Sequence, residues 1–133
     1  MKYLPAYATA LVIFLALDAV WLGLVAKNFY MSRIGDLILD QPRWGVALVF
    51  YAIYIVGLLY FAISSGIDTG DWRMAALNGA LFGFFAYLTY DATNLATLKG
   101  YDPLIAAVDV AWGTVLSGVV AGATVAIVRA LGR

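Results

Sequence analysis

The chain of 133 residues contains no cysteine, no histidine and no glutamate. Without cysteine it can form no disulfide, no thiolate zinc site and no cysteine nucleophile. Without histidine it lacks the usual general base near pH 7 and the commonest metal ligand. All eight acidic residues are therefore aspartates. Any acid–base or cation chemistry must use aspartate, tyrosine, lysine, backbone groups or water.

Charge of either sign is also scarce. Eight basic and eight acidic residues give a net charge of zero. We therefore expect no nucleic-acid partner, because no global basic field is present to attract one. By contrast, 65% of the residues are hydrophobic and the mean hydropathy is +0.92. This composition is typical of membrane proteins, and the length predicts a single transmembrane domain over residues 1–133.

Four apolar segments predict transmembrane spans at about residues 4–26, 44–64, 74–98 and 103–128. Each has roughly 20–25 residues, enough to cross a hydrocarbon core about 30 Å thick. The longest link, residues 28–43, is expected to hold a short interfacial helix, and residues 64–72 are expected to form a turn rich in Gly, Ser and Asp. Because short links favour antiparallel neighbours, the expected fold is all-α, an up-down bundle of four transmembrane helices.

Two features of this bundle concern its packing and its orientation. Gly79/Gly83 and Gly118/Gly122 form G-x-x-x-G pairs, which let helix backbones approach closely in a membrane.

Four spans put both termini on one side, and the Lys and Arg residues then divide four against four between the two sides. The positive-inside rule therefore selects no orientation. We expect one fixed topology, with dual insertion and an antiparallel dimer as the alternative.

Three aspartates lie inside the expected spans: Asp18, Asp91 and Asp109. An ionisable side chain at bilayer depth costs at least roughly 2.5–3.5 kcal/mol on insertion scales. Hydrogen bonds between membrane helices average only about 0.6 kcal/mol, so structural adhesion alone is a weak reason to keep three such residues. We favour a functional polar site, and a purely structural role is the alternative.

All three aspartates are expected at one depth. Asp18 and Asp91 lie nine and eight residues before the lysines that end their spans, and Asp109 lies seven residues past the loop before its span. At about 1.5 Å per residue they fall roughly 10–14 Å below the same interface. Tyr51 reaches this layer from the second span, and Asn94 follows Asp91 by one helical turn.

Helical spacing adds aromatic companions to this layer. Asp18, Trp21 and Val25 share one face of the first span, and Asp109 and Trp112 share a face of the last. We expect Trp21 and Trp112 to wall the polar layer and to donate an indole N–H to a carboxylate.

Three carboxylates in a low dielectric cannot all stay ionised without compensation. Either some are protonated, or a cation lies among them. In the second case Asp18, Asp91 and Asp109 are the candidate metal ligands. Hard oxygen ligands suit protons, Na⁺, Mg²⁺ or Ca²⁺ and argue against soft metals. Apart from such a cation, we expect no cofactor.

The motifs LDAVWLG (17–23), YDATNLATLKG (90–100) and VDVAWGT (108–114), set in four spans, resemble a domain-of-unknown-function family of small bacterial inner-membrane proteins. The resemblance extends over nearly the whole chain. It implies a multi-pass, four-helix protein in the bacterial inner membrane. It implies no activity, because no reaction is established for the family.

The leading functional hypothesis is a small transporter or channel for protons, metal cations or a cationic solute. A homodimer or larger assembly is expected, because one small bundle leaves little room for an aqueous path. The first alternative is a membrane-embedded enzyme that modifies lipid with an Asp-bound divalent metal. The second is a structural or helper subunit of a membrane complex. We lean against an enzyme, because the chain lacks histidine and any known aspartate-rich transferase motif.

Overall fold

The computed structural model describes residues 3–35 and 43–132, which are almost entirely helical and contain no strand. The elements in chain order are α1 (Leu4–Val20), the π-helical turn η1 (Trp21–Val25), α2 (Lys27–Ile34), α3 (Trp44–Leu58), the π-helical turn η3 (Leu59–Ile63), α4 (Ser64–Thr69), α5 (Trp72–Thr97) and α6 (Pro103–Ala130). The all-α prediction is confirmed for these residues. A helix also occupies the start of the longest link, and residues 36–42 of that link lie outside the described part.

Three helical runs in the described part are long and apolar enough to cross a membrane. They are Leu4–Val25, Trp44–Thr69 and Pro103–Ala130. Helix α5 has 26 residues, so its length would also suffice. It carries more polar residues than the other three and is not among the apolar runs. A fourth transmembrane span therefore stays a prediction.

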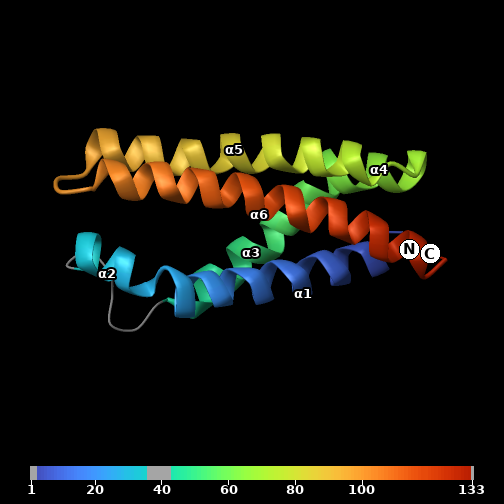
Figure 1. Ribbon diagram of the computed structural model, residues 1–133, viewed down its shortest axis with the longest axis horizontal. Coiled ribbons are helices and arrows are strands. Elements are labelled where there is room, and N and C mark those ends of the chain that lie inside the picture. Colours follow the sequence, from blue (N-terminus) through green and yellow to red (C-terminus); the bar gives the residue numbers. More distant parts are fainter. Residues whose placement is uncertain (1–2, 36–42, 133) are drawn as a thin grey trace.

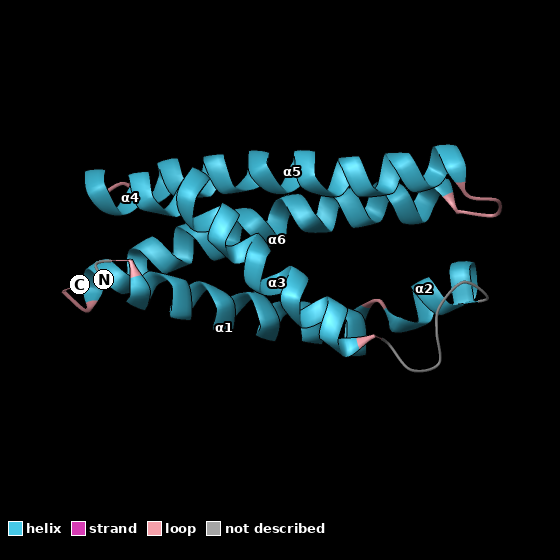
Figure 2. Ribbon diagram, turned by 180° about the vertical axis from the view of Figure 1, so that it is seen from behind, coloured by secondary structure: helices cyan, strands magenta, loops and turns pink. Residues whose placement is uncertain are grey.

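Helices α5 and α6 lie side by side and antiparallel along their whole length (Figure 1). Helix α1 packs against α6, whereas α3 starts beside α1 and crosses obliquely until η3 reaches α5 and α6. Seen from behind, both chain ends lie at one end of the molecule and α2 extends beyond the end of α1 at the other (Figure 2). The oblique path of α3 lets one helix contribute both to the core and to the site described below.

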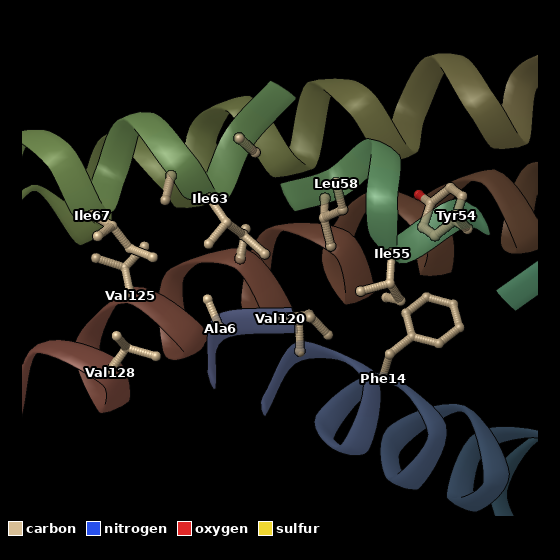
Figure 3. Close-up of a cluster of buried hydrophobic side chains, with 14 of the residues drawn as sticks. Ala6, Phe14, Tyr54, Ile55, Leu58, Ile63, Ile67, Val120, Val125 and Val128 are labelled. Atoms are coloured by element: carbon tan, nitrogen blue, oxygen red, sulfur yellow. The ribbon is translucent and has the colours of Figure 1, made fainter. Parts of the chain in front are cut away.

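A cluster of buried apolar side chains joins α1, α3, η3, α4 and α6 (Figure 3). Phe14 of α1, Ile55 and Leu58 of α3, and Val120 of α6 are all fully buried there. In a bilayer such a cluster stabilises the fold mainly through close van der Waals contact, because lipid tails are as apolar as these side chains.

Glycines set the spacing between α5 and α6. A Cβ atom added to Gly79 would lie 2.6 Å from the Ala121 Cβ, and one added to Gly118 would lie 3.1 Å from the Ala76 carbonyl oxygen. The two G-x-x-x-G pairs therefore pack one helix against the other within the same chain, which the sequence pattern had left open.

The turn expected at residues 64–72 is shorter than predicted. Residues 64–69 are helical as α4, and only Gly70 and Asp71 form the turn. The hydroxyl of Ser64 donates to the Tyr60 carbonyl at 3.0 Å, so a serine at this point is compatible with a continuing helix. The helix ends where Gly70 takes a left-handed φ of 75°, a conformation that favours glycine.

The π-helical turn η1 lies directly beside the predicted polar layer. The Ala26 N–H donates to the Trp21 carbonyl, five residues back, at 2.7 Å. The wider turn rotates the chain relative to a regular α-helix, and Val25 is 64% exposed instead of sharing the buried face of Asp18. The predicted face is thus wrong at Val25, although Asp18 itself is buried.

Candidate functional site

Asp18 on α1 is held by donors from two other helices. The Tyr51 hydroxyl of α3 donates to its Oδ2 at 3.1 Å, and the Trp112 indole N–H of α6 donates to its Oδ1 at 3.1 Å. The side chain of Asp18 is buried. The sequence predicts Tyr51 at the depth of Asp18 and an indole N–H that donates to a carboxylate. It does not say which indole bonds to which aspartate.

Asp91 on α5 and Asp109 on α6 form a second polar cluster. The Tyr101 hydroxyl donates to Asp91 Oδ1 at 2.7 Å, and the Tyr30 hydroxyl donates to Asp109 Oδ1 at 3.2 Å. The two carboxyl groups also lie within hydrogen-bonding reach of each other. The Asn94 side chain adjoins the Tyr101 hydroxyl, so it belongs to this cluster.

A pair of stacked indoles joins the two clusters. The rings of Trp21 and Trp112 are nearly parallel at 7°, with centroids 4.4 Å apart. Trp112 donates to Asp18, whereas Trp21 donates through its Nε1–H to the Tyr30 hydroxyl at 3.2 Å. Tyr30 in turn donates to Asp109, which completes a connected polar region. All seven residues that the sequence singled out therefore lie in this region.

The three aspartates are not grouped around one point in the described residues. Within residues 3–35 and 43–132, no group of three or more acidic side chains is spaced to hold a metal ion. Tyr51 and Trp112 already take both oxygens of Asp18, while Asp91 and Asp109 turn toward each other. Metal ligation by Asp18, Asp91 and Asp109 together therefore stays a prediction, without support from the geometry of the described residues.

A cavity of about 590 Å³ opens between α1, α3, α5 and α6. Asp18 and Asp109 line it, and Asp91 does not. Its other walls are largely aromatic: Phe50, Tyr51, Tyr54, Tyr87, Tyr90 and Trp112. The exposed Arg43 also lines the cavity, so the space reaches the molecular surface there. The arrangement is an acidic, aromatic pocket with one cation at its rim.

Tyr30 and Tyr101 contribute to the site, and the sequence reasoning missed both. Each lies in a link between the expected spans. Gly100, with a left-handed φ of 78°, makes the turn just before Tyr101. The sequence did contain a signal for both residues: each of the two links at the end of the helices nearest the aspartates contains a tyrosine. Burial raises the pKa of Tyr30 and of Tyr101 above the usual range, so both phenols stay protonated donors at neutral pH.

An ion pair holds α2, and with it Tyr30, over the start of α6. The Arg33 guanidinium lies 3.0 Å from Asp102 Oδ2. Asp102 also caps α6, since its Oδ1 accepts from the Leu104 N–H at 2.8 Å. The hydrogen bond from Arg33 holds the pKa of Asp102 below its usual range.

Comparison with known proteins agrees with the membrane character of the helices. No curated protein and no solved structure gave a match. Residues 3–126 match a family model described as "Predicted membrane protein (DUF2177)". Since that match covers most of the chain, and three of its helices are apolar enough to span a bilayer, the protein belongs to the DUF2177 family of predicted membrane proteins.

Proposed function

We propose that this protein is a small membrane transporter that binds an organic cation in the cavity between α1, α3, α5 and α6. The observation that carries the proposal is the acidic, aromatic lining of that cavity. Asp18 and Asp109 supply negative charge at its walls, and the surrounding rings supply faces that attract cations.

The size of the cavity favours an organic cation over a bare metal ion. About 590 Å³ falls within the range of roughly 300–1,000 Å³ that is typical of small-molecule sites. A ring face within reach of a cation contributes about 0.5–1 kcal/mol at exposed sites and about 2 kcal/mol or more where water is excluded. Tyr51 and Trp112 line the cavity next to Asp18, and one face of Trp112 is stacked on Trp21.

The proposed setting is a multi-pass protein of the bacterial inner membrane. In it α5 is the fourth span, and the four long helices form an up-down bundle with both chain ends on one side. The antiparallel packing of α5 on the apolar helix α6 supports this assignment, because a helix that pairs with a spanning helix along its length has the same extent across the bilayer. A homodimer or larger assembly remains part of the proposal.

The metal-dependent enzyme has less support than the transporter. Its mechanism needs carboxylates grouped around one divalent ion, whereas these aspartates are paired with tyrosine and indole donors. The helper-subunit alternative stays a prediction that isolation of an active homo-oligomer would exclude.

Cation binding can be tested with fluorescent ethidium on the protein in lipid nanodiscs, with empty nanodiscs as the blank. Asp18→Asn should weaken binding about tenfold, or about 1.4 kcal/mol, because it removes one of the two cavity charges. Asp71→Asn is the matched control: Asp71 caps α5 away from the cavity, and asparagine is an equally good cap. Equal binding by parent and Asp18→Asn protein would contradict the proposal, as would failure of the parent to bind ethidium, tetraphenylphosphonium and tetraethylammonium alike.

Transport is tested separately in proteoliposomes loaded with DNA, which traps incoming ethidium and reports it by fluorescence. The parent protein should accelerate uptake over protein-free liposomes, and Asp18→Asn should remove most of the increase. Binding without any accelerated uptake would reduce the proposal to a cation-binding membrane protein and contradict its transport step.

A further inference from the structure

We propose that Asp91 and Asp109 share one proton, and that this proton leaves when a cation occupies the cavity beside Asp109. The shared proton is independent of the proposed function, whereas its release rests on it. The pair thus makes the protein a proton-for-cation exchanger.

The placement of the pair favours a shared proton. The carboxyl groups of Asp91 and Asp109 come from neighbouring helices and lie within hydrogen-bonding reach. An ionised carboxylate only accepts hydrogen bonds, so two carboxyl groups can bond to each other only if one of them carries a proton.

An unsatisfied atom supports a proton between the two groups. Asp91 is fully buried, and its Oδ1 accepts from Tyr101. Its Oδ2 is buried and has no hydrogen-bond partner among the described residues. A buried oxygen without a partner is costly, and an ionised one much more so. A proton shared between the two carboxyl groups removes this cost, because one group then donates and the other accepts.

In the described part of the chain, no positive charge is in contact with the pair to replace the proton, and Arg43 lines the cavity of Asp109 only at its rim. Tyr30 faces Asp109 from α2, Tyr101 faces Asp91 from the α5–α6 link, and Asp18 on α1 adds a further carboxyl group nearby. Arg33, which lies on α2 with Tyr30, is paired with Asp102. Two neighbouring carboxyl groups in such surroundings cannot both ionise without compensation.

Asp109 connects the proton to the cavity. It lines the cavity and is only half-buried, whereas Asp91 lies behind it and is fully enclosed. A cation beside Asp109 stabilises the ionised form of the pair by direct attraction. The O–H bond then breaks, the proton passes to water in the cavity, and the cation takes its place. One positive charge enters as one leaves, so the charge within the helices stays the same.

The shared proton is tested by infrared spectroscopy of the full-length protein in lipid at neutral pH, without any ligand. With aspartate labelled by ¹³C, the parent should show a band from a protonated aspartic acid that shifts in D₂O. Asp91→Asn and Asp109→Asn should each remove it, because the remaining carboxylate accepts from the new amide and needs no proton. Asp18→Asn and Asp71→Asn should keep it. Absence of the band in the parent, which needs no variant to fold, overturns the shared proton, as does its persistence in both single variants.

Proton release is tested by adding ethidium to the same protein in weakly buffered solution with a pH indicator. The parent should release about one proton for each ethidium bound, and the band should fall in step with the occupancy. Asp91→Asn protein should bind ethidium without releasing a proton. Binding to the parent with no release overturns the exchange. If the parent binds no ethidium although the band is present, the proposed function fails and the shared proton stands.

Discussion

Tyr51 shows how one hydroxyl group can position a costly carboxylate. Its O–H donates to Asp18 Oδ2, while Trp112 serves the other oxygen. Without the Tyr51 hydroxyl, Asp18 Oδ2 loses this donor, but the aromatic ring stays in the cavity wall. Removing only this hydroxyl therefore tests the hydrogen bond to Asp18 without changing the packing of the ring.

We expect Tyr51→Phe to lower the free energy of unfolding by about 0.6 kcal/mol, the average for a hydrogen bond between membrane helices, and by no more than about 1.7 kcal/mol. Tyr60→Phe is the control and should have almost no effect, because the Tyr60 ring is 74% exposed. Denaturation in mixed micelles of dodecyl sulfate measures both. An equal loss in the two variants would contradict the assigned role of Tyr51.

At the scale of elements, the spacing of α5 and α6 depends on glycine. We expect Gly79→Ala to lower the free energy of unfolding by about 1–3 kcal/mol, because the new methyl group would lie 2.6 Å from the Ala121 Cβ and force the helices apart. Gly23→Ala makes the same chemical change where nothing lies within 4 Å. It should be neutral or stabilising by up to about 1 kcal/mol, because alanine is the better helix former. Thermal unfolding in detergent compares them, and equal effects would contradict the close packing.

Helix α2 depends on the Arg33–Asp102 ion pair, and its stability should therefore change with pH. The pKa of Asp102 is lower in the folded protein than in the unfolded chain, so the pair stabilises the fold above the unfolded value. That contribution is lost as the pH falls through the lowered folded value, which means below about pH 4. The protection of the α2 amides from hydrogen exchange, measured relative to the intrinsic rate at each pH, should fall in that range for the parent, and Arg33→Gln should show the lower protection already at neutral pH. Unchanged exchange in the variant would mean that the pair does not hold α2.

At the scale of the whole molecule, the absence of cysteine makes the topology directly measurable. Thr69 and Thr97 are exposed residues near opposite ends of α5, and neither is charged. Single Thr69→Cys and Thr97→Cys substitutions therefore keep the four-against-four balance of Lys and Arg. With α5 as a span and one fixed topology, an impermeant thiol reagent should label one variant from outside the cell and the other only after lysis. Half-labelling of both variants would indicate dual insertion, and full labelling of both from one side would contradict α5 as a span.

The sequence by itself determined the helices and the common level of Tyr51 and Asp18 along them. Long apolar runs fix where helices form, and the constant rise per residue placed Tyr51 at the level of Asp18 before any contact was known. Tertiary structure alone decided which acids meet. The π-helical turn η1 rotates the chain after Trp21 and exposes Val25, and the oblique α3 brings Tyr51 to Asp18. The links between the helices place Tyr30 next to Asp109 and Tyr101 next to Asp91. Helix rotation, crossing angle and loop path all depend on packing between segments far apart in the chain. They decided that Asp91 adjoins Asp109, whereas Asp18 accepts from Trp112.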